Sequence, residues 1–483
     1  MEQKDKTNQD PEHLYQYDED FRDSIATVDE EGKRIWVYPK KPSGRFHNLR
    51  IVVTIVLLAA LFAGPFIQVN GHPFLLFNIF ERTFIIFGAT FWPQDFFLLA
   101  ITLITFFVFV ILFTVTFGRL WCGWACPQTL FMEMVFRKIE YLIEGDANSQ
   151  RKLDANGWTL EWIVKKGLKQ FIFILISLII SHTLMAYIIG LGPTLEIISK
   201  SPAENLSGFI GLAVFTFIFY GVFSYFREQA CTVVCPYGRL QGVLLVKESI
   251  IVAYDYIRGE PRGKIEKGKT SNGKGDCIDC KLCVHVCPTG IDIRNGTQLE
   301  CVNCTACIDA CDDVMDKTHR PKGLIRYSSD AAIKEGHSKV FTGRVAAYSL
   351  VLVGLISLLS FMLATRTDVD ASIHRVPGMV PQKTGNGNVR NFYNVQIINK
   401  TFNEMALSMK LENKENASIT FVGSDDKIVL GENGRYEGTI IVLLPETQIK
   451  TGKNLLVIGV YNNGEKIDEV ETSFSGGLPG KKP

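Results

Sequence analysis

The chain has 483 residues, enough for several domains, and its formal net charge is +1. This balance indicates little by itself, because the charges are segregated along the chain, but we expect no nucleic-acid partner. The hydrophobic fraction of 47%, with 33 phenylalanines, is high for a soluble protein of this charge. All twelve cysteines lie between Cys122 and Cys311, which favours metal-site cysteines in a reducing compartment over structural disulfides.

Residues 1–50 are predicted to form a polar tail without a cleavable signal peptide, because no apolar core lies near the start. Five later runs are apolar and long enough to cross a bilayer: residues 51–69, 96–117, 171–191, 206–226 and 345–365. Residues 74–92 are also apolar, but Glu81 and Arg82 interrupt them, so we expect an external or interfacial loop there. The lipid bilayer is therefore an expected partner.

Basic residues in the short flanking segments predict the orientation of a multi-pass protein. They gather before the first run, after the second and after the fourth, whereas the loops after the first and third runs carry few. We therefore expect a cytoplasmic tail (1–50), four transmembrane helices (51–240), a cytoplasmic domain (241–340), a fifth transmembrane helix (341–366) and a periplasmic domain (367–483). The expected location is a bacterial inner membrane.

Two cysteine pairs, each followed by proline, stand just past the second and fourth apolar runs. They are Cys122 and Cys126 in WCGWACPQT, and Cys231 and Cys235 in ACTVVCPYG. On a helix, residues i and i+4 share a face, so two such pairs could supply four thiolates. Thiolates suit Cu(I), zinc and iron–sulfur centres, and the preceding Arg119 and Arg227 would favour the thiolate form. Inert packing is the alternative, but two matching pairs favour a metal or redox site.

Other residues near these pairs are weaker candidates. Met132 and Met134 could offer thioether ligands to copper, although packing is the more ordinary role of methionine. His182 lies inside the third apolar run, where a histidine is a functional candidate by default or simply a hydrogen-bonding partner for a neighbouring helix. We assign no role to His285, and we expect residues 137–140 to be a solvated helix end.

The remaining eight cysteines form two runs with the spacing C-x2-C-x2-C-x3-C, which is typical of bacterial two-cluster ferredoxins. In such runs the fourth cysteine ligates the other cluster. We therefore expect one 4Fe–4S cluster on Cys277, Cys280, Cys283 and Cys311, and a second on Cys301, Cys304, Cys307 and Cys287. Zinc sites and disulfides explain two successive four-cysteine runs less well. The segment between the runs, residues 288–300, is short and leaves little room for a hairpin.

The last part of the chain changes to short, alternating apolar segments separated by turn residues. The predicted strands cover residues 392–398, 406–411, 418–422, 436–444, 455–461 and 469–474. Six short strands in about a hundred residues favour an immunoglobulin-like β-sandwich. This segment shows no catalytic constellation, so we expect a binding or assembly module. The fold class is thus a five-helix membrane region, a two-cluster ferredoxin-like domain and an immunoglobulin-like β-sandwich.

At these residues the chain resembles the CcoG/FixG/RdxA family of membrane iron–sulfur proteins, which are accessory proteins of cbb3-type cytochrome c oxidase assembly. The resemblance covers nearly the whole chain. It rests on the two C-x3-C-P motifs, on CIDCKLCVHVCPTGIDIRNGTQLECVNCTACIDACDD and on the β-domain. It implies two 4Fe–4S clusters, copper delivery to the oxidase, and reduction of Cu(II) to Cu(I) at or near Cys122, Cys126, Cys231 and Cys235.

The resulting hypothesis is a cupric reductase, with copper as its substrate and the four C-x3-C-P cysteines as catalytic residues and copper ligands, within one subunit or across a homodimer. A soluble cytoplasmic donor or a quinol would supply electrons. Cu(I) would pass to a copper chaperone or transporter and to the oxidase assembly proteins. Two alternatives stay open: a quinol dehydrogenase that conducts electrons to a partner reductase, and a non-enzymatic assembly factor.

Overall fold

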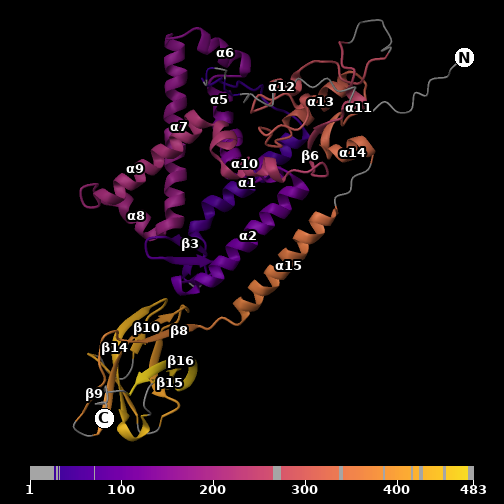
Figure 1. The fold of residues 1–483 in the computed structure, drawn as a ribbon. Coiled ribbons are helices and arrows are strands. Elements are labelled where there is room, and N and C mark those ends of the chain that lie inside the picture. Colours follow the sequence, from indigo (N-terminus) through magenta and orange to yellow (C-terminus); the bar gives the residue numbers. More distant parts are fainter. Residues whose placement is uncertain are drawn as a thin grey trace, which may run out of the picture. The chain divides into compact units, whose positions relative to one another are not determined.

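The computed structural model describes residues 27–28, 31, 33–69, 71–264, 273–336, 341–384, 387–414, 417–423, 428–449 and 453–476. The chain divides into two compact units. The first comprises Met1–Leu76 and Ile101–Ile356, and the second Phe77–Ala100 and Ser357–Pro483 (Figure 1). The cysteine motifs all belong to the first unit, so the candidate site is contained in one compact body.

Five helices in the described residues are long and apolar enough to cross a membrane, which confirms the five predicted spans. They are α1 (Arg45–Ala63), α2 (Phe96–Phe117), α7 (Leu160–Ile189), α9 (Leu206–Gly221) and α15 (Gly343–Ala364). A 3₁₀ turn, η3 (Gly64–Phe66), extends α1, and a π-helical turn, η6 (Val222–Phe226), extends α9. Helix α7 begins earlier than the apolar run, because the Thr159 hydroxyl accepts a hydrogen bond from the Trp162 amide and caps a polar first turn.

The predicted loop at residues 74–92 instead forms a small three-stranded sheet. Its strands are β3 (Leu75–Asn78), β4 (Thr83–Ile86) and β5 (Ala89–Phe91). The charged residues that interrupt the apolar run fall in the β3–β4 turn, where Glu81 and Asn78 hydrogen-bond to each other at 3.0 Å. Further along, Asp95 pairs with Arg366 at 2.8 Å and with Lys400 at 2.7 Å. These ion pairs join residues 77–100 to the C-terminal part within the second unit.

Short helices follow α2 and α9, and one of them forms an aromatic core with α7 and η6. They are α3 (Leu120–Trp124), α4 (Pro127–Leu130), the π-helix η5 (Phe131–Phe136), α5 (Arg137–Ile143), α6 (Ala147–Ala155), the π-helix η7 (Ala230–Val234) and α10 (Pro236–Leu244); α8 (Leu191–Ser199) connects α7 to α9. The Phe136 ring stacks on Phe223 with centroids 4.6 Å apart, and it meets Phe173 edge-on. This core packs η5 and η6 against α7.

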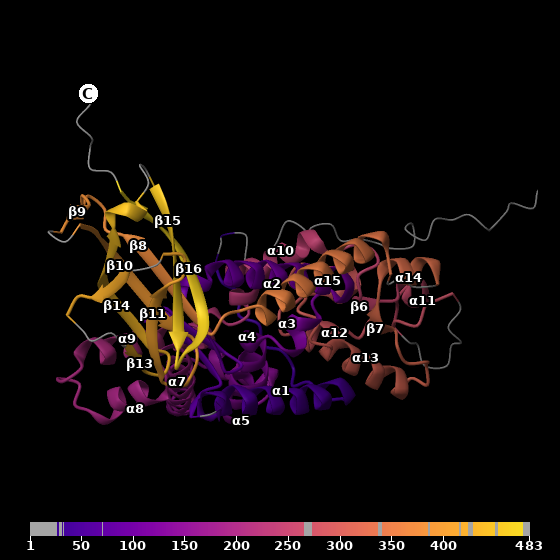
Figure 2. The ribbon, with the colours of Figure 1, turned by 90° about the horizontal axis from the view of Figure 1, so that it is seen from below.

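The cysteine-rich segment is closed at its two ends by one antiparallel strand pair, β6 (Ile251–Tyr254) with β7 (Ile325–Ser328). Between them lie α11 (Tyr256–Gly259), α12 (Leu282–His285), the 3₁₀ turn η8 (Ile293–Asn295) and α13 (Ala306–Lys317), and α14 (Asp330–Glu335) follows β7 (Figure 2). The connection between the two cysteine runs holds only η8 among its regular elements, as its shortness predicts.

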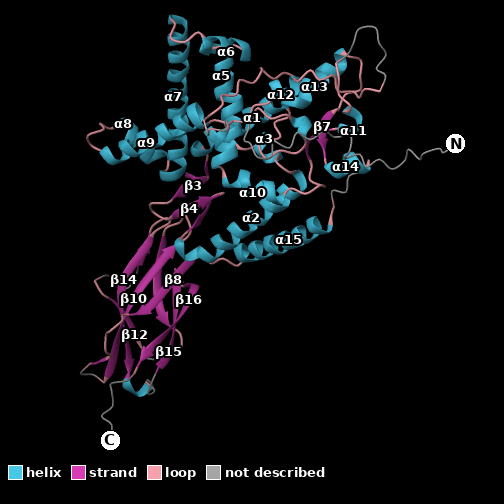
Figure 3. Ribbon diagram, turned by 45° about the horizontal axis from the view of Figure 1, so that its top comes forward, coloured by secondary structure: helices cyan, strands magenta, loops and turns pink. Residues whose placement is uncertain are grey.

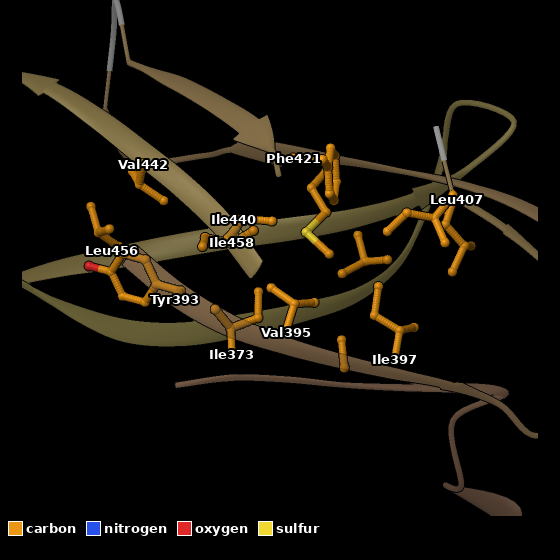
Figure 4. Close-up of a cluster of buried hydrophobic side chains, with 14 of the residues drawn as sticks. Ile373, Tyr393, Val395, Ile397, Leu407, Phe421, Ile440, Val442, Leu456 and Ile458 are labelled. Carbon is orange, nitrogen blue, oxygen red and sulfur yellow. The ribbon is translucent and has the colours of Figure 1, made fainter. Parts of the chain in front are cut away.

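The C-terminal domain has two antiparallel sheets, which confirms the predicted immunoglobulin-like sandwich (Figure 3). The first sheet has the strand order β12 (Ser418–Phe421), β14 (Arg435–Pro445), β10 (Asn388–Asn399) and β8 (Val369–Arg375), and β9 (Gln382–Lys383) pairs with β10. The second sheet has the strand order β13 (Ile428–Leu430), β11 (Met405–Leu411), β15 (Lys453–Asn462) and β16 (Glu465–Ser475). Inward side chains such as Ile373, Tyr393 and Ile458 form its core (Figure 4). The strands β8, β9 and β13 were not predicted.

Candidate metal centre

The eight ferredoxin-type cysteines line two cavities. Four of them line one cavity: Cys277, Cys280, Cys283 and Cys311. The neighbouring cavity is lined by Cys283, Cys287, Cys301, Cys304 and Cys307. The described residues that line the two cavities include no histidine, aspartate or glutamate. A donor set of cysteine sulfurs alone fits an iron–sulfur cluster in each cavity.

The two cysteine runs repeat one backbone conformation. Asp279 and Lys281 flank Cys280 with φ values of 52° and 56°. Asn303 and Thr305 flank Cys304 with φ values of 53° and 64°. Left-handed residues other than glycine are uncommon, so two of them at equivalent places in both runs mark a shaped loop rather than a chance turn. Each loop leads directly into a helix, α12 or α13, that carries the third cysteine of its run.

The two C-x3-C-P pairs do not lie on continuous α-helices, so the prediction of an i, i+4 face is wrong. Cys122 lies in α3, but Cys126 is the extended residue before α4, with ψ 122°. Cys231 lies in the π-helix η7, and Cys235 is the extended residue before α10, with ψ 114°. Proline explains the break, because it forces the preceding residue out of the α conformation and favours the first position of a new helix.

The two pairs nevertheless meet at one place next to the second ferredoxin run. Cys122 and Cys231 both pack against the buried cluster that contains Cys304 and Val302. Gln241 of α10 contacts the Cys122 sulfur at 3.4 Å, and the Thr129 hydroxyl lies 4.0 Å from the Cys231 sulfur. Within the described residues, however, no three histidine, cysteine, aspartate or glutamate side chains gather closely enough to hold a single metal ion, here or elsewhere.

Gly123 brings the first pair into direct contact with the second ferredoxin run. A Cβ atom on Gly123 would lie only 2.4 Å from the Asn303 carbonyl oxygen and 2.7 Å from that of Val302. The buried Arg50 side chain bridges the same contact, because it donates to the carbonyl oxygens of Gly123 and Cys304, both at 3.0 Å. A glycine between the cysteines thus allows the two backbones to touch.

Arg119 holds three segments of the chain together. Its guanidinium donates to the carbonyl oxygens of Gly238 at 2.6 Å and Cys301 at 3.3 Å, and also to that of Leu299. Burial raises the pKa of the Cys122 thiol to about 11 and that of Cys231 to about 12, and the neighbouring cysteines add to both rises. Arg119 lowers the pKa of Cys122, as expected, but burial outweighs it, and Arg227 pairs with Glu140 instead of a thiol. These sulfurs therefore need a bound cation to lose their protons.

Arg227 belongs to a buried ion-pair network that sequence analysis missed. Its guanidinium donates to both carboxylate oxygens of Glu140, at 2.6 and 2.7 Å. Arg137 and Glu140, expected in a solvated helix end, are only 1% and 2% exposed. Burial would raise the pKa of Glu140, but Arg227 and other cations lower it to about 2. The one signal in the sequence was the i, i+4 spacing of Glu133 and Arg137, which pair at 3.4 Å.

Replacing Arg227 with methionine should destabilise this region by about 3–5 kcal/mol, because the Glu140 charge would stay buried without its main partner. Hydrogen exchange of the α5 amides in the detergent-solubilised protein measures the loss. Lys165→Met is the matched control, since Lys165 forms an exposed pair with Glu161 and should cost less than about 1 kcal/mol. Equal exchange in the two variants would contradict the importance of the buried pair.

The weaker candidates take ordinary structural roles. Met132 is 3% exposed in the aromatic core and Met134 is 6% exposed, so both are packed. His182 has its Nδ1 atom 2.6 Å from the Leu178 carbonyl oxygen of its own helix. The His285 carbonyl oxygen accepts a hydrogen bond from the Lys40 amide at 2.7 Å, which ties the N-terminal segment to the first ferredoxin run.

Comparison with protein-family models identifies three matching segments. Residues 99–144 match a 4Fe-4S binding domain and contain the first C-x3-C-P pair. Residues 226–330 match a 4Fe-4S dicluster domain and contain the second pair and both ferredoxin-type runs. Residues 359–477 match a model described as the Ig-like fold at the C-terminus of FixG.

Several characterised chains are similar along most of their length. Protein RdxB of Cereibacter sphaeroides is 34% identical over 412 residues, which cover 82% of this chain and 86% of RdxB. Protein RdxA of the same organism is 34% identical over 80% of this chain and 84% of its own. Nitrogen fixation protein FixG of Rhizobium meliloti is 33% identical over 81% of this chain and 82% of FixG. A crystal structure of a FixG-related protein from Vibrio parahaemolyticus matches 23% of this chain and 100% of its own, with 16% identity and a TM-score of 0.21.

Proposed function

The chain belongs to the FixG/RdxA family of membrane iron–sulfur proteins, and from this we propose that it reduces Cu(II) to Cu(I) for assembly of a cbb3-type oxidase. Membrane helices and 4Fe–4S domains make electron transfer its general activity. The copper step is our specific proposal. It adds one electron to each Cu(II) ion.

We assign the cluster ligands by the two cavities. Cys277, Cys280, Cys283 and Cys311 would hold one 4Fe–4S cluster, and Cys287, Cys301, Cys304 and Cys307 the other. Each cluster supplies one-electron storage when bound. The surrounding chain contributes shape and burial: the β6–β7 pair closes the segment that carries all eight cysteines, and Cys277, Cys283 and Cys304 are buried while Cys280 is exposed.

The single observation that carries the proposal is the contact of the C-x3-C-P pairs with the second ferredoxin run. Gly123 touches the Val302–Asn303 backbone, and Cys122 and Cys231 pack against Cys304. Soft thiolates favour Cu(I) over Cu(II), so cysteines at this contact would bind the product of the reduction better than the substrate. A substrate ion that must leave again needs an open site rather than a closed, preformed one.

The orientation forms part of the proposal. Basic flanks favour a cytoplasmic ferredoxin domain and a periplasmic β-domain. Copper would then be reduced at the inner face of the membrane and passed to a chaperone or transporter, while the β-domain would bind assembly partners on the other side. In this arrangement Cys122, Cys126, Cys231 and Cys235 are the residues that touch copper.

Metal analysis of the anaerobically purified protein tests this assignment. We expect eight iron and eight sulfide ions per chain, because each of the two clusters contains four of each. We also expect the protein to retain copper after Cu(I) is added. The variant with all four C-x3-C-P cysteines changed to serine should keep the eight iron and lose the copper. Iron loss in that variant, with unchanged copper binding, would contradict the proposal.

A further inference from the structure

A further cavity in the first unit, separate from the two that the ferredoxin-type cysteines line, has no part in the copper proposal. It has a volume of about 340 Å³ and lies between the N-terminal segment, α5, α6, α7 and η6. Rings of Trp36, Tyr38, Trp162 and Phe173 line it together with ionised side chains. This volume and this mixture of rings with a few polar groups are typical of sites for small organic molecules.

The cavity lies where α7 leaves the membrane. The helix has 30 residues, about ten more than a bilayer core requires. The side chains of Trp162, Lys166, Lys169, Gln170 and Phe173 line the cavity and share one face of α7. The other face of these turns is apolar and exposed, with Leu160, Ile163, Val164, Leu168 and Phe171 between 48% and 78% exposed. This part of α7 therefore turns its apolar face outward and its polar face inward, as a helix in the lipid interface does.

The charges in the cavity balance. Three acidic residues, Glu140, Glu144 and Asp154, face three basic ones, Lys166, Lys169 and Arg227, so the lining has no net charge. Every one of the six is paired: Lys169 with Glu144 at 2.8 Å, Lys166 with Asp154 at 2.8 Å, and Arg227 with Glu140 at 2.6 Å. A lipid phosphate would find no surplus cation here. A neutral amphipathic molecule fits the lining better.

A chain of ion pairs leads from the interior of the cavity to water. The Glu144 side chain is 2% exposed and shares Lys166 with Asp154, whose side chain is 30% exposed. The Tyr38 hydroxyl also donates to Asp154, at 2.7 Å. Burial alone would raise the pKa of Asp154, but hydrogen bonds from Lys166 and Tyr38 lower it, so the carboxylate carries its charge at the water-facing end of this chain.

The same cavity is next to the C-x3-C-P cysteines. Arg227 lines the cavity, and Glu228 follows it in the chain. The carbonyl oxygen of Glu228 accepts a hydrogen bond from the backbone amide of Cys231 at 3.1 Å. Gln128, two residues after Cys126, contacts the Arg227 carbonyl oxygen at 3.5 Å. Arg227 therefore links the cavity lining to the segments that carry both C-x3-C-P pairs.

We propose that this cavity binds the head group of a membrane quinol and is the entry point for electrons. The inference rests on the proposed electron-transfer function and names its donor. The quinol loses two electrons and two protons and becomes a quinone. The two 4Fe–4S clusters, when held by the eight ferredoxin-type cysteines, would take up one electron each. The protons pass to the carboxylates of Glu144 and Asp154 and from there to water.

The experiment uses menadiol as a water-soluble probe and follows bleaching of the visible iron–sulfur absorbance in the anaerobic full-length protein. We expect menadiol to bleach the wild-type protein and Asp154→Asn to slow this about a hundredfold, the lower end of what a positioned proton acceptor contributes. Lys138→Gln, in a separate cavity beside α1 and α5, is the matched control and should react at the wild-type rate. Dithionite, which needs no binding site, should bleach all three proteins equally.

Binding gives a second readout that does not depend on the clusters. Menadione should quench the fluorescence of Trp36 and Trp162, and the quenching should disappear when both residues are changed to phenylalanine. Bleaching by dithionite but not by menadiol would overturn the quinol site while leaving copper reduction intact. Equal menadiol rates in wild type and Asp154→Asn, or a phospholipid in the cavity that menadione does not displace, would also overturn it. Loss of copper reduction by dithionite-reduced protein would instead refute the proposed function.

Discussion

Changing Cys122 and Cys126 together to serine is expected to abolish Cu(II) reduction, while both iron–sulfur clusters remain. The physical reason is that a hydroxyl is a hard, weakly acidic ligand and cannot replace a thiolate for Cu(I). The eight ferredoxin-type cysteines lie in their own cavities, so cluster content should stay at the wild-type level. Single-turnover mixing of dithionite-reduced protein with Cu(II), in the presence of a Cu(I) chelator, measures the effect.

The matched control for this pair is Met132→Leu. Met132 lies six residues after Cys126 but packs in the aromatic core, and leucine nearly conserves its volume. We expect normal copper reduction in this variant. If the serine variant still reduces copper at the wild-type rate with full iron content, the ion reacts elsewhere and the C-x3-C-P assignment is wrong.

Gly123→Ala should slow the same reaction by as much as about a hundredfold, although no ligand is removed. The new methyl group would lie 2.4 Å from the Asn303 carbonyl oxygen, so the second ferredoxin run has to move by roughly 1 Å, a displacement that can cost this much in rate. Overpacking should also destabilise the contact by about 1–3 kcal/mol. The rate of copper reduction and the iron content are measured together, because we expect the Gly123→Ala variant to react slowly while it keeps its clusters.

Gly167→Ala provides the control for a glycine substitution. This residue lies in α7, and a Cβ atom there has open space around it. It should have no effect on copper reduction and should stabilise the helix slightly, since alanine is the better helix former. If both alanine variants reduce copper at the wild-type rate, the close backbone contact at Gly123 is not part of the electron path.

Local sequence patterns predicted the elements well where one physical signal dominates. Apolar length alone gave the five membrane helices, with the second matching its observed bounds, Phe96–Phe117. Alternation gave six of the strands of the β-domain, and Asn463-Gly464 forms the two-residue turn between β15 and β16, with φ values of 48° and 93°. The short strands β9 and β13 carry too few residues for a visible alternation.

The interior of the candidate site was harder to predict, because it depends on contacts between distant segments. The i, i+4 argument for the cysteine pairs overlooked the constraint that Pro127 and Pro236 place on the residue before them. The pairing of Arg227 with Glu140 spans 87 residues, and nothing in the local sequence marks it. For the same reason Arg137 was expected on the surface, although Glu228, which lies 91 residues away in the sequence, pairs with it.

The contacts of Gly123 and Arg50 show which kind of information was missing from the sequence. A glycine between two cysteines is unremarkable by pattern alone, and an arginine at a membrane boundary is ordinarily a topology signal. Only the fold reveals that Arg50 is 3% exposed and reaches the carbonyl oxygens of Gly123 and Cys304. These two residues join the halves of the site that the sequence identified separately.

The most direct test of the account is a stopped-flow measurement in which dithionite-reduced protein, freed of excess reductant, is mixed with Cu(II) under strictly anaerobic conditions. Iron–sulfur absorbance and Cu(I) formation are recorded together. The account predicts that the absorbance recovers at the same rate at which Cu(I) appears, with two Cu(I) per chain from two one-electron clusters. Clusters that stay reduced in the presence of Cu(II), or Cu(I) that forms equally fast without Cys122, Cys126, Cys231 and Cys235, would contradict it.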